Sequence, residues 1–394
     1  MELRYVYDVP LPNSFAATTQ ILRTGAACAA AGHRFSLAAG LISAPAEEIL
    51  RQTGADPAAD ISIDSVFPDR PRHRWLRPLM RAAVLRREMR SSERVLISRG
   101  ETALAVAAAL GPRHPKRPRF VLEIHKLLCL DAAERQVGQY LEALPNSRLR
   151  RLEARAISRA DGLIFLTEAV RTAVQSAFET NAPWVVAPSG VEVPVHAPDS
   201  PHDIDLVFAG KIEARKGVLL ALEMLAALPM ARLRLIGDGA DMDQVRHRAA
   251  APDLADRVEI VGRVPHSDVA RHLARGRVGL CLLPAEIDHV SACFSSPMKL
   301  LEMMALGLPV VASDTASVRA VCTDGVDALL VPPDDPACMA AAAARLLEDK
   351  AMRKRLGAAA RARAKDFSWE RRAQRIAGLC QTVDDGYSAG ANIG

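Results

Sequence analysis

Short runs of branched apolar residues alternate with longer segments of helical periodicity along almost the whole chain, and this alternation constrains the fold most. Such alternation is typical of βα units, whose strands form a parallel sheet. The sequence therefore predicts an α/β protein with doubly wound sheets. We expect strands near residues 4–7, 35–38, 63–67, 94–97, 120–124, 162–166 and 184–187, and then near 206–209, 233–236, 258–261, 278–283, 310–312 and 328–331.

The length of the chain predicts two domains. A chain of 394 residues, 49% of them hydrophobic, is longer than a single hydrophobic core usually supports. Each half is therefore expected to bury a core of its own. A polar, proline-bearing stretch at residues 194–205 reads as the linker. The predicted domains are residues 1–193 and 206–366. Residues 367–394 are predicted to form a C-terminal helix and tail. Packing of this helix against the N-terminal domain is one arrangement that the sequence leaves open.

The net charge of +5 lies entirely in residues 1–200, which carry 26 basic and 21 acidic residues. Between Asp69 and Arg99, ten arginines face three acidic residues. This Arg70–Arg99 region is either a solvated helix face or a surface for an anionic membrane or a polyanionic acceptor. Aromatic residues are too sparse there to stack on bases, so we expect no nucleic-acid partner.

Seven scattered cysteines, without a C-x-x-C pair, argue against a disulfide framework and a zinc knuckle and fit a reducing cytoplasm. The first residues lack the pattern of a signal peptide, and the longest apolar stretch is far shorter than a membrane-spanning helix needs. We therefore expect a cytoplasmic protein that is soluble or, at most, peripheral at the inner face of the membrane.

The first candidate site lies in the segment LVFAGKIEARKG, which reads as a strand that ends near Gly210 and a basic loop that opens a helix. Lys211 and Lys216 flank this loop. Ligands of open α/β sheets bind at the carboxyl ends of strands, where helix amides attract anions. Two cations there can neutralise a diphosphate. If the diphosphate is the leaving group of a transfer reaction, these cations also raise the rate of that reaction. The alternative is two solvated lysines at a helix start, where the helix dipole disfavours a cation.

The second candidate site lies in the segment CFSSPMKLLEMMALGLPVVASD. Ser295–Pro297 indicates a helix start, with a serine as N-cap and the proline in the first turn. The free amides of that start, with Lys299 close by, form an anion site. Glu302 follows among apolar neighbours, where its carboxylate can accept two hydroxyl hydrogen bonds, as a ribose diol offers. A surface acid near a helix start is the alternative.

The order of the segments GKIEARKG, LRLIGDG, VEIVGRVPHSDVARHLARG, SSPMKLLEMMALGLPVVASD and GVDALLVPPDD is specific. In order and spacing, roughly from Leu206 to Asp335, they resemble the retaining GT-B glycosyltransferases of family four. The resemblance implies two Rossmann-like doubly wound domains facing a central cleft. It also implies a nucleoside-diphosphate sugar as donor, with uridine or guanosine as its base. A hexosyl group would pass, with retention of anomeric configuration, to a glycan, lipid-linked or small-molecule acceptor.

The resemblance also implies roles for individual residues. The basic pair that grips the donor phosphates corresponds to Lys211 and Lys216 after Gly210. The glutamate that binds the ribose corresponds to Glu302. Arg263 and Val264 lie in the segment that receives the nucleobase. The loop that holds the donor hexose corresponds to Ser295, Ser296, Pro297, Met298 and Lys299.

Two positions depart from the family pattern. The family has arginine at the first basic position, so Lys211 supplies a point charge in place of a planar fork. The first glutamate of the family's glutamate pair, eight positions before Glu302, is Phe294 in this chain. Branches of the family with a serine-proline-lysine loop also lack that glutamate.

In the first half the resemblance is weaker. His125 follows the strand 120–124, where family members often place a histidine near the donor sugar. A structural histidine is the alternative. The first strand leads into DVPLPNSFAATTQ in place of the family's glycine-rich loop. We expect this loop to border the acceptor, with Asn13, Ser14 and Thr18 as contacts.

Other functions remain open at this point. Gly237-Asp238-Gly239 imitates a dinucleotide-binding turn, but Met242 occupies the third glycine position of that motif. A nucleotide-sugar epimerase of similar plan is a second enzyme alternative. Phe294 also leaves open a non-catalytic partner subunit that binds nucleotide sugars. No resident cofactor or metal is expected, because the Asp203–Asp205 pair lies in the linker without further ligands.

Overall fold

The computed structural model describes residues 1–13, 15–66, 85, 94–110, 112, 117–131, 146–195, 201–285 and 289–391. The chain divides into two compact units. Unit 1 comprises Met1–Pro188 and Trp369–Gly394, and unit 2 comprises Ser189–Ser368. The division thus falls a few residues before the proline-bearing stretch 194–205, whose last two residues begin the first strand of unit 2.

Unit 1 contains a seven-stranded parallel sheet in the order β3-β2-β1-β4-β5-β6-β7. Its central strands are rich in branched residues because helices cover both faces of such a sheet. In the register, Glu2 lies opposite Arg34 on one side and opposite Arg94 on the other. The strands are β1 (Glu2–Val6), β2 (Arg34–Ala39), β3 (Ile61–Ser65), β4 (Arg94–Arg99), β5 (Arg119–Ile124), β6 (Gly162–Phe165) and β7 (Trp184–Val186).

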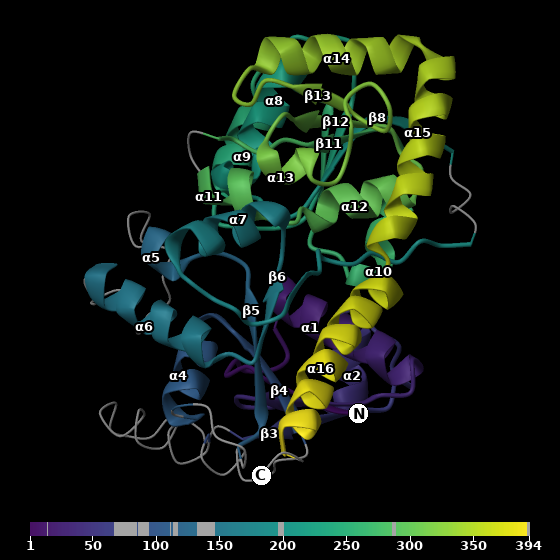
Figure 1. The fold of residues 1–394 in the computed structure, drawn as a ribbon. Coiled ribbons are helices and arrows are strands. Elements are labelled where there is room, and N and C mark those ends of the chain that lie inside the picture. Colours follow the sequence, from purple (N-terminus) through teal and green to yellow (C-terminus); the bar gives the residue numbers. More distant parts are fainter. Residues whose placement is uncertain are drawn as a thin grey trace. The chain divides into compact units, whose positions relative to one another are not determined.

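Two helices from opposite ends of the sequence share the core of unit 1. Leu22 on the first helix and Ile376 on the last pack with Leu3 and Val121 of the sheet in one buried cluster. Figure 1 shows the last helix, α16, beside strands β5 and β6. The described helices are α1 (Ala16–Ala30), α2 (Ala46–Gln52), α4 (Gly100–Leu110), α5 (Leu128–Asp131), α6 (Asn146–Arg159), α7 (Glu168–Ala177) and α16 (Trp369–Ala391).

Unit 2 contains a six-stranded parallel sheet in the order β10-β9-β8-β11-β12-β13. Alternate residues of one strand face opposite sides of a sheet. Accordingly, Leu206 and Phe208 belong to one buried cluster, and Val207 and Ala209 to the other. The strands are β8 (Ile204–Ala209), β9 (Leu233–Ile236), β10 (Val258–Gly262), β11 (Gly276–Cys281), β12 (Val310–Ser313) and β13 (Leu329–Val331).

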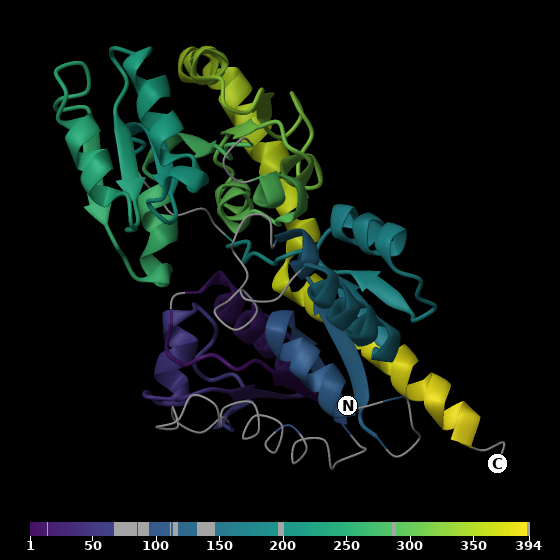
Figure 2. The same ribbon diagram turned by 90° about the vertical axis from the view of Figure 1, so that its left-hand side faces the viewer.

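Helices cover both faces of this second sheet, as Figure 2 shows. Residues of α8, α9 and α14 line one buried cluster, residues of α10 and α12 line the other, and α15 contributes to both. The helices are α8 (Val218–Ala226), α9 (Met242–Ala249), α10 (His266–Leu273), α11 (His289–Phe294), α12 (Met298–Ala305), α13 (Ala316–Arg319), α14 (Pro336–Glu348) and α15 (Lys350–Ala364), with 3-10 turns at Ala214–Lys216 and Lys365–Phe367.

The prediction of two Rossmann-like doubly wound domains is confirmed. The strand expected near each predicted position is present, with ends that differ by up to about two residues. In both sheets the order reverses beside the first strand of the unit. This reversal places a switch point between β1 and β4 in unit 1, and between β8 and β11 in unit 2. Ligands of open α/β sheets bind outside the carboxyl ends of the strands at such points.

Candidate functional site

The loop after β8 lies at the switch point of unit 2 and contains Gly210, Lys211 and Lys216. It is held against the loop after β9. The Gly210 amide donates to the Ile236 carbonyl at 2.9 Å, and the Gly237 amide donates to the Gly262 carbonyl at 2.8 Å. Gly237 has a φ of 137°, and a Cβ atom on it would lie 1.8 Å from the Gly210 carbonyl oxygen. Only glycine fits there, so the Gly237-Asp238-Gly239 turn packs against the basic loop.

The far end of the basic loop is fixed against β11. Gly217 has a φ of 82°, and a Cβ atom on it would lie 2.0 Å from the Leu282 carbonyl oxygen. The backbone around Lys216 therefore lies close to the carboxyl end of β11, directly across the switch point from the end of β8.

Lys299, on the first turn of α12, points to the same place. Its ammonium group donates to the backbone carbonyl of Lys216 at 2.9 Å and lies 4.5 Å from the ring centre of Phe208. Burial, together with the charge of Lys216, lowers the pKa of Lys299 to about 8. The structure thus brings together Gly210, Lys216 and Lys299, which are widely separated in the sequence.

Lys211 is placed differently. Its side chain is half exposed, and its ammonium nitrogen lies 3.7 Å from the Glu213 carboxylate. Glu213 also forms an ion pair of 2.6 Å with Arg215. Sequence reasoning missed Glu213, although an acidic residue within a basic loop is recognisable from the sequence as a partner for the neighbouring cations. The loop therefore carries a smaller net positive charge than its lysines and arginine alone would give.

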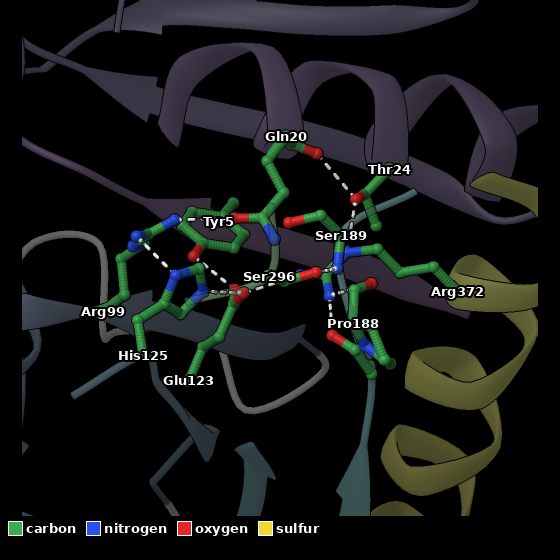
Figure 3. Close-up of polar contacts among 11 residues, drawn as sticks. Tyr5, Gln20, Thr24, Arg99, Glu123, His125, Pro188, Ser189, Ser296 and Arg372 are labelled. Carbon is green, nitrogen blue, oxygen red and sulfur yellow. Dashed lines mark hydrogen bonds and ion pairs between the residues drawn. The ribbon is translucent and has the colours of Figure 1, made fainter. Parts of the chain in front are cut away.

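The start of α12 differs from the prediction. Pro297, and not a serine, is the N-cap residue, and the helix begins at Met298, which is half-buried. Ser296 does not cap the helix; its hydroxyl accepts a hydrogen bond of 3.0 Å from the Ser189 amide, a contact drawn in Figure 3. Ser295 precedes it in the same loop between α11 and α12. The expected serine cap is therefore wrong.

Glu302 lies on α12 with a side chain that is 23% exposed. Its carboxylate is 3.8 Å from Nε2 of His266, the first residue of α10. Sequence reasoning missed His266. Arg263 and Val264 lie between β10 and α10, next to Gly262 at the carboxyl end of β10. Phe294 ends α11 and is half-buried.

In unit 1, His125 belongs to a buried polar network around Glu123 (Figure 3). The Glu123 carboxylate accepts hydrogen bonds from the Tyr5 hydroxyl at 2.5 Å, from His125 Nε2 at 2.6 Å and from the Arg372 guanidinium at 2.6 Å. Arg99 contacts the other ring nitrogen, Nδ1, at 2.7 Å. A guanidinium can only donate, so Nδ1 accepts and Nε2 carries the proton.

These contacts fix the charges of the network. Burial alone would raise the pKa of Glu123, but Arg372, His125 and Arg99 outweigh it and hold that pKa well below its usual range. Burial and the Arg99 charge lower the pKa of His125 to about 4. His125 is therefore neutral at physiological pH, and both of its ring nitrogens are bonded within unit 1. This geometry favours the structural alternative for His125.

The predicted acceptor-side residues lie just before α1. The Asn13 side-chain oxygen accepts hydrogen bonds from the Phe15 amide at 2.8 Å and from the Thr18 hydroxyl at 2.9 Å. Its side-chain nitrogen donates to the Pro10 carbonyl at 2.7 Å. Asn13 and Thr18 thus organise the start of the helix, and Ser14 lies outside the described residues.

Asp203 and Asp205 form ion pairs with Arg275 and Arg277, respectively.

Among the described residues, no group of three or more His, Cys, Asp or Glu side chains could hold a metal ion. In the same part of the chain, no helix is long and apolar enough to cross a membrane. Most of the Arg70–Arg99 region lies outside the described residues, so its predicted surface role stays a prediction.

Comparisons with known proteins agree with this architecture. Residues 17–194 match the family model "Glycosyltransferase Family 4", and residues 203–349 match "Glycosyl transferases group 1". A phosphatidyl-myo-inositol mannosyltransferase of Mycolicibacterium smegmatis is 33% identical over 211 residues, which are 50% of this chain and 52% of that protein. The chain spans between about a fifth and two thirds of the length of other curated relatives.

Solved structures show the same fold. HepE of Anabaena, crystallised with UDP and glucose, has a TM-score of 0.73 and 16% identity, and the match covers 97% of this chain and all of HepE. The sucrose-phosphate synthase of Thermosynechococcus elongatus has a TM-score of 0.74 and 19% identity, over 98% of this chain and 99% of that one. The chain therefore belongs to the group 1 glycosyltransferases of family four, with the two Rossmann-like domains of the GT-B fold.

Proposed function

We propose that this protein moves a hexosyl group from a UDP- or GDP-linked sugar to a glycan, lipid-linked or small-molecule acceptor, with retention of anomeric configuration. The observation that carries the proposal is the contact between Lys299 and the Lys216 backbone at the switch point of unit 2. It brings the Lys299 ammonium group and the backbone of Lys216 together beside the start of α12, at the place where open α/β sheets bind phosphates. The UDP-bound relative with the same fold supports a nucleotide-sugar donor.

Each residue of the site has a role in this proposal. Lys216 and Lys299 face the donor diphosphate, and Lys211 adds charge from the edge of the loop. Such preorganised cations stabilise the negative charge that develops on the leaving diphosphate. Glu302 accepts the ribose hydroxyls, Arg263 and Val264 border the nucleobase, and the loop Ser295–Met298 holds the hexose.

The mechanism needs no group beyond these side chains, so we expect activity to persist in a metal chelator. Where the family has its first glutamate, Phe294 offers no carboxylate, and the backbone amides near Met298 are left to bind the sugar hydroxyls. A direct contact of His125 with the donor sugar stays a prediction, and it requires one of its two present hydrogen bonds to open.

The decisive variant is Lys216→Ala. Lys299 bonds to the backbone carbonyl of Lys216, so this substitution removes the side chain beyond Cβ, including the ammonium group, and keeps that contact. Loss of one preorganised charge contact costs about 3 kcal/mol, so we expect turnover of a radiolabelled donor with crude acceptor extract to fall by two orders of magnitude or more.

Lys354→Ala, at an exposed position on α15 in the same unit, is the matched control and should keep full turnover. Equal turnover in the two variants would remove Lys216 from the mechanism. If calorimetry shows that the wild-type chain binds UDP or GDP but turnover is absent with every extract, the chain is a non-catalytic donor-binding subunit. Release of an epimerised nucleotide sugar would instead identify an epimerase.

A further inference from the structure

Glu302 and His266 come from two neighbouring helices of unit 2. Glu302 lies on α12, His266 is the first residue of α10, and the two helices pack against each other on one face of the sheet. Leu273 of α10 and Leu301 of α12 belong to the same buried cluster. Oε1 of Glu302 is 3.8 Å from Nε2 of His266, and the two side chains are 23% and 29% exposed. The pair is therefore partly shielded from water, which strengthens the attraction between its members.

The backbone that leads to His266 is fixed at the carboxyl ends of the strands. The Gly262 carbonyl, at the end of β10, accepts a hydrogen bond of 2.8 Å from the Gly237 amide. Val264 packs against the buried cluster that contains Leu301. In the sequence, His266 thus follows directly after the segment that we assign to the nucleobase. In space, its ring lies next to the carboxylate that we assign to the ribose.

The chemistry of the pair suits a diol. A carboxylate offers about four lone-pair positions on its two oxygens, and a ribose diol occupies two of them. An N–H donated by His266 Nε2 occupies a third and so restricts the rotation of the Glu302 carboxylate. The distance of 3.8 Å is longer than a hydrogen bond. Side-chain contacts in binding sites often tighten when a substrate binds, and a small movement of either side chain closes this gap.

We propose that His266 is a positioning residue for the donor ribose, whose Nε2–H holds the Glu302 carboxylate in the orientation that accepts both ribose hydroxyls. The proposal rests on the donor site proposed above and adds to it a residue that makes the site selective for ribose. His266 acts through Glu302 and not on the reacting bond. Selectivity for a ribonucleotide therefore depends on the pair and not on Glu302 alone.

The test compares, by calorimetry on the full chain, the affinity for UDP or GDP with that for the 2′,3′-dideoxy analogue of the same nucleotide. We expect the wild type to bind the ribonucleotide at least about tenfold more tightly, because the analogue lacks the hydrogen bonds to a charged acceptor. His266→Leu should lower this ratio by about threefold or more. If His266 had only a structural role, both affinities would fall equally. An unchanged ratio in His266→Leu would therefore overturn the proposal.

Two further variants separate the donated N–H from other effects of the substitution. His266→Gln retains a side-chain N–H donor and should keep the ratio of the wild type. A loss in His266→Gln as large as that in His266→Leu would contradict the proposal. His272→Leu is the matched control, because it removes an imidazole from the same helix and leaves His266 in place. It should also keep the wild-type ratio.

A double variant tests whether His266 acts through Glu302. Glu302→Gln should remove most of the discrimination by itself, and His266→Leu added to it should lower the ratio no further. A further fall would show that His266 acts independently, which is the opposite of the proposal. If neither UDP nor GDP binds the wild-type chain, the proposed donor site is wrong, and the role of His266 with it. If Glu302→Gln loses the discrimination but His266→Leu keeps it, only the role of His266 is wrong.

Discussion

Lys299 shows how packing sets the chemistry of a single residue. Its ammonium group lies over the Phe208 ring and beside the Lys216 backbone, away from bulk water. Burial disfavours the charged form, and the nearby Lys216 charge adds to this effect, so the pKa falls to about 8. The folded state therefore binds fewer protons than the unfolded state between about pH 8 and the usual lysine range. The free energy of unfolding is expected to rise with pH in that window.

The same pKa predicts how donor affinity depends on pH. Lys299 attracts the diphosphate only when it is protonated, so the affinity for UDP or GDP should be constant below about pH 8 and fall above it, by about tenfold near pH 9. Calorimetric titrations at pH 7, 8 and 9 measure this change. In Lys299→Met the affinity should be lower and nearly independent of pH over this range. An unchanged pH dependence in Lys299→Met would show that another group titrates.

At the scale of elements, the loops after β8 and β9 form one packed unit, because glycines allow their backbones to touch. Gly237→Ala would force a Cβ atom to within 1.8 Å of the Gly210 carbonyl oxygen. We expect this variant to lose about 2 kcal/mol or more of stability and most of its nucleotide affinity. Thermal unfolding and nucleotide titration measure the two effects.

Gly325→Ala is the control for the backbone conformation alone. Gly325 also has a positive φ, of 70°, but nothing lies within 4 Å of an added Cβ atom. A left-handed alanine costs about 1–2 kcal/mol, and we expect Gly325→Ala to keep its nucleotide affinity. If both variants bind nucleotide equally well, contact between the two loops is not what shapes the site.

The elements were largely predictable from the sequence, whereas several contacts of the site were not. Strand positions follow from local hydrophobic pattern, which is why β8 and β11 lie within about two residues of their expected positions. The predicted serine cap of α12 was wrong: Pro297 is the N-cap residue, and the Ser296 hydroxyl bonds instead to Ser189, which is 107 residues away. Likewise, Glu123 bonds to Tyr5 and Arg372, at separations of 118 and 249 residues. No local pattern encodes partners at such distances.

At the scale of the whole molecule, the chain builds unit 1 from two segments, and Arg372 joins them. Arg372 is the fourth residue after the chain re-enters unit 1. Its guanidinium bonds to Glu123 and to the Thr24 hydroxyl, and also to the carbonyls of Ala187 and Pro188, where the chain leaves the unit. The side chains of both Arg372 and Glu123 are almost completely buried. The last helix therefore completes both the core and the charge balance of unit 1.

Arg372→Ala should consequently destabilise unit 1 far more than a lost surface contact would. It leaves the buried Glu123 carboxylate without its main counter-charge, a change that costs about 3–5 kcal/mol. Trp184 and Trp369 belong to unit 1, and the sequence of unit 2 contains no tryptophan, so tryptophan fluorescence during urea unfolding does not report on unit 2. Arg371→Ala, at the exposed neighbouring position, should leave that transition unchanged.

Adding Glu123→Gln to Arg372→Ala should restore part of the lost free energy of unfolding, because the unpaired charge is then gone. A double variant as unstable as the sum of its single changes would mean that the two residues stabilise the unit independently.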